Sequence, residues 1–182
     1  MSIAIREPYL DPQADALLAG WTRPRRALFL DRDGVINIDH GYVHTPERTQ
    51  FLPGIFQRVR DAHAQGLMPI VVTNQAGIGR GYYDEAAFLA YSAWMHARFA
   101  EQQAPLLATY WCPHHPEHGL GGYRVACDCR KPRPGMLLAA CARFDIHMGE
   151  SLMIGDKDSD LQAGCSAGTR AMLAVDMGEH PA

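Results

Sequence analysis

The sequence contains no long hydrophobic run and no block of basic residues. None of its apolar stretches approaches the roughly 20 residues that cross a bilayer, so we expect no membrane partner. The charges are nearly balanced, with 17 Lys and Arg against 20 Asp and Glu, which argues against nucleic-acid binding through bulk charge. The beginning of the chain lacks the basic and apolar regions of a secretion signal, so we expect a cytoplasmic location.

Internal repeats and low-complexity tracts are also absent. The 182 residues, 47% of them hydrophobic, therefore predict one globular domain with a full core. We place this domain at residues 27–182 and treat residues 1–26 as an N-terminal extension without visible chemistry. Within the extension, the sequence predicts a short helix over residues 12–19 with Asp11 as its N-cap and Pro12 as its first residue.

Apolar, β-branched runs alternate with amphipathic segments along the rest of the chain. Strands are predicted at residues 27–30, 67–72, 106–111, 151–155 and 170–175, and helices at 55–65, 84–102, 134–144 and 158–167. This alternation predicts an α/β fold, a three-layer doubly wound parallel sheet with helices on both faces. Right-handed crossovers would bring the carboxyl ends of all the strands to one edge, where such folds bind ligands.

Two carboxylates stand directly after the first predicted strand. The run Ala27–Leu30 ends in Asp31-Arg32-Asp33-Gly34. Burying an unpaired carboxylate is costly, so these side chains require a cation or a shared proton. A strand followed by an ordinary Asp-Gly turn would explain the same residues, and the motif alone does not decide between the two.

Further polar residues fall at other predicted strand ends and in the loop before the third helix of the domain: Thr73, Asn74, Lys131 and Asp156. Together, Asp31, Asp33 and Asp156 would make a hard oxygen site suited to Mg²⁺. Thr73 and Asn74 can donate hydrogen bonds to phosphate oxygens, and Lys131 can offset the repulsion between a carboxylate nucleophile and an anionic substrate. Asp33, two residues from that nucleophile, is suitably placed as general acid and then general base.

In their order and spacing these residues resemble the four motifs of the haloacid-dehalogenase-like (HAD-like) phosphatases: Asp31-Arg32-Asp33-Gly34-Val35, Thr73-Asn74, Lys131, and Gly155-Asp156-Lys157 with Asp160. The resemblance implies that Asp31 is the nucleophile of an aspartyl-phosphate intermediate and that Asp33 is the acid/base. It also implies that Thr73 and Lys131 stabilise the phosphoryl group and that Asp31, Asp33 and Asp156 hold Mg²⁺. Taken singly, each residue has a structural explanation, such as a helix N-cap for Asp156.

Three of the five cysteines lie between positions 112 and 129. Cys112, Cys127 and Cys129 form a Cys₃His set with His114, of the kind that holds structural zinc, and a reducing compartment favours metal over disulfides. The single-residue gap within each pair is tighter than usual, and His115 and His118 are alternative ligands. A zinc ion here would fix the backbone just before the predicted catalytic lysine.

For the two remaining cysteines and for two loop segments, the sequence predicts structure but no chemical role. Cys141 and Cys165 fall on predicted helices, and we expect both to be buried packing residues. Residues 112–133 are expected to lack regular structure, and the glycines between residues 77 and 81 are expected in a loop.

Several stretches resemble D,D-heptose 1,7-bisphosphate 7-phosphatases from about residue 27 to about residue 175: DRDGVIN, DHGYVH, TNQAGIGRG, CPHHP, CDCRKPRPGM and GDKDSD. The chain lacks the large cap insertions of many HAD-like proteins. The resemblance implies hydrolysis of the C7 phosphate of D-glycero-D-manno-heptose 1,7-bisphosphate with catalytic Mg²⁺ and structural Zn²⁺. The product would be a heptose 1-phosphate for ADP-heptose (lipopolysaccharide core) or GDP-heptose biosynthesis, and we expect a monomer.

The same resemblance implies a set of contacts to this small phosphorylated sugar: Asp39, His40, Gly41, Tyr42, Thr73, Asn74, Gln75, Ala76, Arg130, Lys131 and Lys157. An arginine such as Arg130 suits a second phosphate because its planar fork binds phosphate bidentately.

Two alternatives remain at this point. Histidinol-phosphate phosphatases share the zinc loop and the catalytic motifs, although the GDK and DHGYVH stretches argue against them. A phospho-accepting receiver domain is also doubly wound, but Asp33 provides an acid/base for turnover and the cysteine loop has no place in a receiver.

Overall fold

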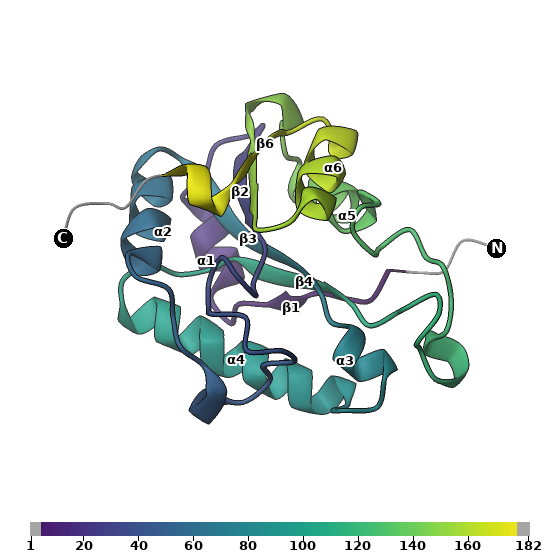
Figure 1. Cartoon of the computed structure of the whole chain (residues 1–182). Coiled ribbons are helices and arrows are strands. Elements are labelled where there is room, and N and C mark those ends of the chain that lie inside the picture. The colour runs from purple at the N-terminus through teal and green to yellow at the C-terminus, as the bar shows by residue number, and fades with distance from the viewer. Residues whose placement is uncertain (1–4, 178–182) are drawn as a thin grey trace.

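A six-stranded β-sheet in the order β1-β4-β3-β2-β5-β6 runs through the centre of the computed structural model, which describes residues 5–177 (Figure 1). Residues 1–4 of the expected extension and 178–182 of the expected domain lie outside the described residues. The strands are β1 (Tyr9–Leu10), β2 (Arg26–Leu30), β3 (Leu67–Asn74), β4 (Ala108–Cys112), β5 (Leu152–Gly155) and β6 (Arg170–Leu173). The α-helices are α1 (Ala14–Ala19), α2 (Ile55–Ala64), α3 (Ala76–Gly79), α4 (Glu85–Glu101), α5 (Gly135–Phe144) and α6 (Asp158–Ala167).

The five strands β2 to β6 pair in parallel, which confirms the predicted doubly wound sheet. Most side chains of β2 to β5 are buried on both faces because helices cover both, whereas the edge strand β6 is half-buried and its Arg170 is exposed. Phe29 of β2 faces a core that α1, α5 and α6 close, whereas its neighbours Leu28 and Leu30 face a second core under α2 and α4. This alternation fixes the register of the strand, since a shift by one residue would exchange the two faces.

Helix α4 illustrates how closely sequence signals set element ends. Asp84 is its N-cap, and the Oδ1 atom accepts a hydrogen bond of 2.7 Å from the backbone N–H of Ala87. The apolar stripe along this helix faces the core, with Phe88 and Phe99 fully buried. Within residues 5–177, no helix combines the length and apolar character needed to cross a membrane.

The N-terminal extension and the glycine-rich segment differ from expectation. The extension contributes β1, which pairs antiparallel with the edge strand β4, so a strand precedes residue 27 after all. Asp11 is not the N-cap of α1, because Gln13 occupies that position and Asp11 turns towards the interior. The segment after β3 begins with the single turn of α3 and not with an irregular loop.

Candidate active site

Lys131 connects three of the predicted motifs at the carboxyl edge of the sheet. Its Nζ atom lies 2.9 Å from Oδ1 of Asp31, which follows β2, and 2.7 Å from Oδ1 of Asp160 in α6. It also donates a hydrogen bond of 2.7 Å to the carbonyl of Val72 in β3. With a 1% exposed side chain, Lys131 is a buried cation whose charge is matched by two carboxylates. Asp160 belongs to the last of the sequence motifs, and its role as a partner of Lys131 is visible only in the structure.

The backbone of Lys131 is held by Asn74. The side-chain oxygen of Asn74 accepts a hydrogen bond from the Lys131 N–H, and its nitrogen donates one to the Lys131 carbonyl, at 3.1 and 3.0 Å. Both ends of this amide are therefore occupied by the loop that carries the lysine. In this structure Asn74 positions Lys131, and because its amide nitrogen has a second N–H, the predicted hydrogen bond from Asn74 to phosphate stays a prediction.

Three carboxylates cluster beside the lysine, and ligand oxygens of Asp31, Asp156 and Asp160 lie within 4.8 Å of one another. Asp160 is already engaged, because its Oδ1 faces Lys131 and its Oδ2 accepts from the backbone N–H groups of Asp156 and Lys157. Oδ1 of Asp156 is buried without a hydrogen-bond partner. Burial, together with the Asp31 carboxylate, raises the pKa of Asp156. A buried, unpartnered carboxylate oxygen next to a second carboxylate fits a bound cation.

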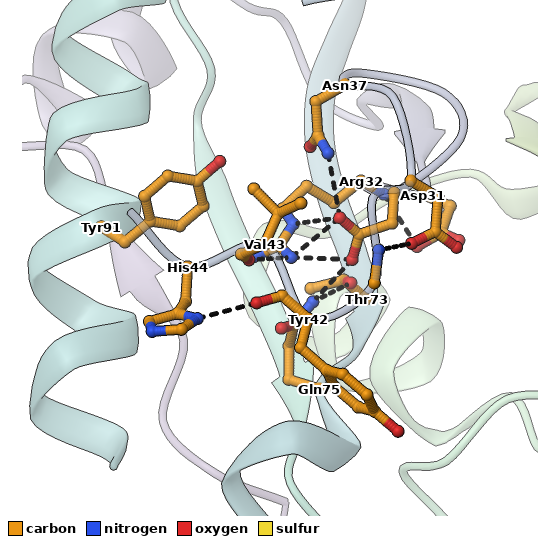
Figure 2. Close-up of polar contacts among 12 residues, drawn as sticks. Asp31, Arg32, Asn37, Tyr42, Val43, His44, Thr73, Gln75 and Tyr91 are labelled. Carbon is orange, nitrogen blue, oxygen red and sulfur yellow. Dashed lines mark hydrogen bonds and ion pairs between the residues drawn. The ribbon is translucent and has the colours of Figure 1, made fainter. Parts of the chain in front are cut away.

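Asp33 is surrounded by hydrogen-bond donors. Arg32 contacts both carboxylate oxygens, at 2.7 Å between its Nη2 and Oδ2, and Asn37 donates to Oδ1 at 3.0 Å (Figure 2). Gln75 donates to Oδ2 at 3.3 Å. Arg32 is 2% exposed; burial alone would lower its pKa, but the Asp33 carboxylate together with Tyr91 and Tyr83 outweighs burial, and the pKa is raised. Arg32 is therefore part of the site. Its position between Asp31 and Asp33 in the sequence is the signal that could have indicated this role.

A cavity of about 600 Å³ opens at this edge of the sheet. It is lined by Asp31, Asp33 and every predicted substrate contact except His40: Asp39, Gly41, Tyr42, Thr73, Asn74, Gln75, Ala76, Arg130, Lys131 and Lys157. His40 is exposed and Asp156 is half-buried, and neither belongs to the cavity lining. The structure adds Tyr83 and Ser159 to the lining, although the sequence predicted no role for either.

An ion pair joins the two loops that face each other across the cavity. Nζ of Lys157, after β5, lies 3.3 Å from Oδ2 of Asp39 and 3.5 Å from Oδ2 of Asp156. Burial alone would lower the pKa of Lys157, but these carboxylates outweigh it and the pKa is raised. Lys157 therefore stays cationic at neutral pH and adds positive charge to the cavity.

The predicted Cys₃His set is assembled at the end of β4. The sulfurs of Cys112, Cys127 and Cys129 lie 3.1–3.5 Å apart, and Nδ1 of His114 lies 3.4 Å from the Cys129 sulfur. All four side chains are buried, and their ligand atoms lie within 4.8 Å of one another. Contact with the Cys127 and Cys129 sulfurs, together with burial, raises the pKa of the Cys112 thiol. Three thiols and one imidazole that converge in this way could hold a metal ion.

The other histidines and cysteines are placed differently. His115 is half-buried and its Nδ1 accepts hydrogen bonds from the N–H groups of Glu117 and His118, whose own side chain is exposed, so neither alternative histidine joins the cluster. Cys141 packs partly buried against the core, but Cys165 is exposed, so the expectation that it is buried is wrong. Cys165 lies on the solvent side of α6, a short helix in which few positions face the core.

The metal-ligand cluster is connected to the cavity through Arg130. Its Nη1 atom donates a hydrogen bond of 3.1 Å to the backbone carbonyl of His114. Arg130 follows Cys129 and precedes Lys131, so the segment that carries both cations begins directly at the cluster.

Comparisons with known proteins agree with this geometry. A family model described as HAD-hydrolase-like matches residues 128–182. The D-glycero-alpha-D-manno-heptose-1,7-bisphosphate 7-phosphatase of Burkholderia mallei is 56% identical over 150 residues, which cover 82% of this chain and 79% of the relative. The D-glycero-beta-D-manno-heptose-1,7-bisphosphate 7-phosphatase of Escherichia coli is 44% identical over 153 residues, which cover 84% of this chain and 80% of the relative.

A solved structure shows the same fold. The D,D-heptose 1,7-bisphosphate phosphatase of B. bronchiseptica, complexed with magnesium and phosphate, superposes with a TM-score of 0.72 at 32% identity, covering 86% of this chain and 88% of that one. The fold and the strand-end carboxylates, with these likenesses, define a HAD-like phosphatase. More narrowly, the chain belongs to the D-glycero-D-manno-heptose-1,7-bisphosphate 7-phosphatase family. These relatives favour neither the histidinol-phosphate phosphatase nor the receiver-domain alternative.

Proposed function

We propose that this chain removes the C7 phosphate of D-glycero-D-manno-heptose 1,7-bisphosphate through an aspartyl-phosphate on Asp31. The observation that supports this most directly is the pair formed by Asp31 and Lys131 in the wall of the 600 Å³ cavity. An ammonium 2.9 Å from the nucleophile offsets its repulsion from an anionic substrate and stabilises charge in the transition state. The identity of the sugar is inferred from the relatives, which are named heptose-1,7-bisphosphate 7-phosphatases.

In the first step, a carboxylate oxygen of Asp31 attacks the C7 phosphorus, and the bond between phosphorus and the sugar oxygen breaks. The leaving oxygen takes a proton from the Asp33 carboxyl. In the second step, the Asp33 carboxylate takes a proton from water, the resulting hydroxide attacks the phosphorus, and Asp31 is released with inorganic phosphate. The hydroxyl of Thr73, 1% exposed at the end of β3, is suited to hold a phosphoryl oxygen.

Mg²⁺ is the metal that we propose for the carboxylate cluster. Asp31 and Asp156 would bind it through their side chains, Asp33 through its backbone carbonyl, and the unpartnered Oδ1 of Asp156 supports this choice. A bound Mg²⁺ neutralises charge on the transferring phosphoryl group. Asp160 is not included, because both of its oxygens are used by Lys131 and the backbone.

Zn²⁺ is the metal that we propose for Cys112, His114, Cys127 and Cys129. A closed set of four soft ligands with no open position is typical of a structural zinc site. Its role would be to fix the loop that leads to Arg130 and Lys131. Arg130, which lines the cavity, would bind the second phosphate at C1, and Lys157 would turn from Asp39 to the substrate.

The experiment that tests this function compares kcat/KM for four substrates: the α and β anomers of the heptose bisphosphate, fructose 1,6-bisphosphate and histidinol phosphate. We expect one heptose anomer to give the highest value and the product to be heptose 1-phosphate. A preference for histidinol phosphate of more than about tenfold, which is about 1.4 kcal/mol in transition-state binding, would refute the proposal. Light scattering in solution tests the expected monomer in the same preparation.

A further inference from the structure

A chain of buried hydrogen bonds runs from Tyr83 to the acid/base aspartate. The Tyr83 hydroxyl donates a 2.6 Å hydrogen bond to Oε1 of Gln75. The Nε2 atom of the same amide donates to Oγ1 of Thr73 at 2.8 Å and to Oδ2 of Asp33 at 3.3 Å. Gln75 is 2% exposed and Tyr83 is 9% exposed, so water competes little for these groups. Two residues with proposed roles in catalysis therefore share one donor, the Gln75 amide.

The direction of this amide is not arbitrary. A carboxylate only accepts hydrogen bonds, so the nitrogen of Gln75 has to face Asp33. The oxygen of the amide then points the opposite way, into the protein, where it requires a donor. Tyr83 supplies that donor, and because burial raises the pKa of Tyr83, its hydroxyl keeps its proton. Without it, the buried amide would lose the group that selects its orientation.

Tyr83 is held by two close neighbours. Its ring stacks on His44, with the ring centroids 4.2 Å apart and the planes 12° from parallel. The His44 ring is anchored by Nδ1, which donates to the Tyr42 carbonyl at 2.7 Å (Figure 2). Gly77 also lies close to the Tyr83 ring, and an added Cβ there would come within 2.4 Å of it. These contacts restrict the ring and therefore its hydroxyl.

We propose that Tyr83 is a positioning residue that, through Gln75, holds Asp33 and Thr73 in the arrangement that protonates the leaving oxygen. The inference rests on the proposed function and goes beyond it, because the Tyr83 hydroxyl reaches Asp33 and Thr73 through the Gln75 amide and has no role in the proposed steps. Its consequence is selective: loss of the hydroxyl should harm the transfer of a proton to the leaving group and spare the attack by Asp31.

The test is the variant Tyr83→Phe assayed with two leaving groups. The heptose bisphosphate releases an alkoxide that needs a proton from Asp33, whereas 4-nitrophenyl phosphate releases a phenolate that is stable without one. The parameter is kcat/KM, which reports events up to formation of the aspartyl-phosphate and excludes the later use of Asp33 as base. We expect kcat/KM for the sugar to fall about tenfold, within the range that general acid catalysis contributes, and the value for 4-nitrophenyl phosphate to stay within about twofold.

Tyr82→Phe is the matched control. Tyr82 is the neighbouring tyrosine, its side chain is 56% exposed, and it does not line the cavity. Both substrates should therefore be cleaved at the wild-type rate by this variant. Gln75→Leu and the double variant Gln75→Leu/Tyr83→Phe test the route: if Tyr83 acts through Gln75, removing both costs no more than removing Gln75 alone.

Equal losses on both substrates would show a merely structural role and overturn the inference, as would an unchanged kcat/KM for the sugar. Additive losses in the double variant would overturn the route through Gln75. Failure of the proposed function appears differently, as a wild-type enzyme that does not cleave the heptose bisphosphate. In that case Tyr83→Phe and its control Tyr82→Phe are compared on fructose 1,6-bisphosphate, another alkyl phosphate. The inference about Tyr83 is therefore tested whether or not the proposed substrate is cleaved.

Discussion

The ammonium of Lys131 lies 2.7 Å from Oδ1 of Asp160, and both side chains are 1% exposed. This ion pair joins the loop before α5 to the first turn of α6. It also holds the Lys131 ammonium beside the Asp31 carboxylate. Oδ2 of Asp160 also accepts hydrogen bonds from the backbone N–H groups of Asp156 and Lys157. One carboxylate therefore holds both the Lys131 cation and the loop that carries the proposed metal ligand.

Asp160→Asn should therefore reduce both stability and activity. Removing one partner of a buried ion pair leaves an uncompensated charge, which costs roughly 3–5 kcal/mol; because Lys131 retains Asp31, we expect about 3 kcal/mol. Urea denaturation gives the free energy of unfolding, and phosphate release gives kcat/KM. Asp158→Asn, an exposed acid in the same helical turn, is the control and should change either quantity little. An Asp160→Asn protein as stable as the wild type would contradict this account.

Asp31→Asn should abolish turnover and leave the fold intact. The amide cannot form the acyl phosphate, but it has the size of the carboxylate and can still accept a hydrogen bond from Lys131. Phosphate release should be undetectable, and the circular dichroism spectrum should match that of the wild type. Turnover by a verified Asp31→Asn preparation would rule out the covalent mechanism.

The positions of many site residues could be predicted from the sequence, because the topology of a parallel sheet brings the ends of its strands together. In a parallel sheet, residues that follow strands meet at one edge, so Asp31, Thr73 and Asp156 could be brought together from their positions alone. Strand β1 could not be found this way. Two residues carry no periodicity, and Tyr9 and Leu10 are in a strand only because β4 offers a free edge.

The polar partners inside the site were also beyond the sequence. Asn74 hydrogen-bonds to the backbone of Lys131 because of the orientation of its side chain, and the spacing of residues in a sequence does not predict that orientation. The sequence predicted His114 as the ligand and left His115 and His118 as alternatives, because the choice depends on which ring the loop turns inward; the structure brings His114 to the cysteines.

Cys127→Ala should lower activity from a distance. Losing one of four ligands weakens zinc binding, and the loop that carries Arg130 and Lys131 then loses its anchor at the His114 carbonyl. We expect kcat/KM to fall about tenfold or more, the scale on which supporting shells of metal sites act. Zinc content and kcat/KM are measured together, with Cys165→Ala, an exposed cysteine outside the cluster, as the control. A folded, zinc-free Cys127→Ala protein with full activity would show that the cluster does not position the catalytic lysine.

A buried pair between Asp11 and His96 attaches the N-terminal extension to the rest of the domain. Oδ2 of Asp11 lies 3.0 Å from Nδ1 of His96 in α4, and Nε2 of that ring lies 2.9 Å from the Thr109 hydroxyl in β4. Burial alone would raise the pKa of Asp11, but the hydrogen bonds from His96 and from the Gln13 N–H outweigh it, so the pKa is lowered. We propose that the extension is an integral part of the folded domain, supported by this pair and by strand β1.

A lowered pKa in the folded state means that Asp11 stabilises the protein above its ordinary pKa of 3.8 and that this contribution is lost as the pH falls through the lower, folded value. Asp11→Asn should therefore reduce the free energy of unfolding near neutral pH by about 1–3 kcal/mol, the range for a hydrogen bond to a charged group. The difference from the wild type should shrink in urea titrations performed below about pH 4. Asp15→Asn, an exposed acid in α1, should match the wild type throughout, and kcat/KM should be unchanged in both variants because Asp11 lies outside the cavity lining. A constant deficit of Asp11→Asn at every pH would show that its charge does not attach the extension.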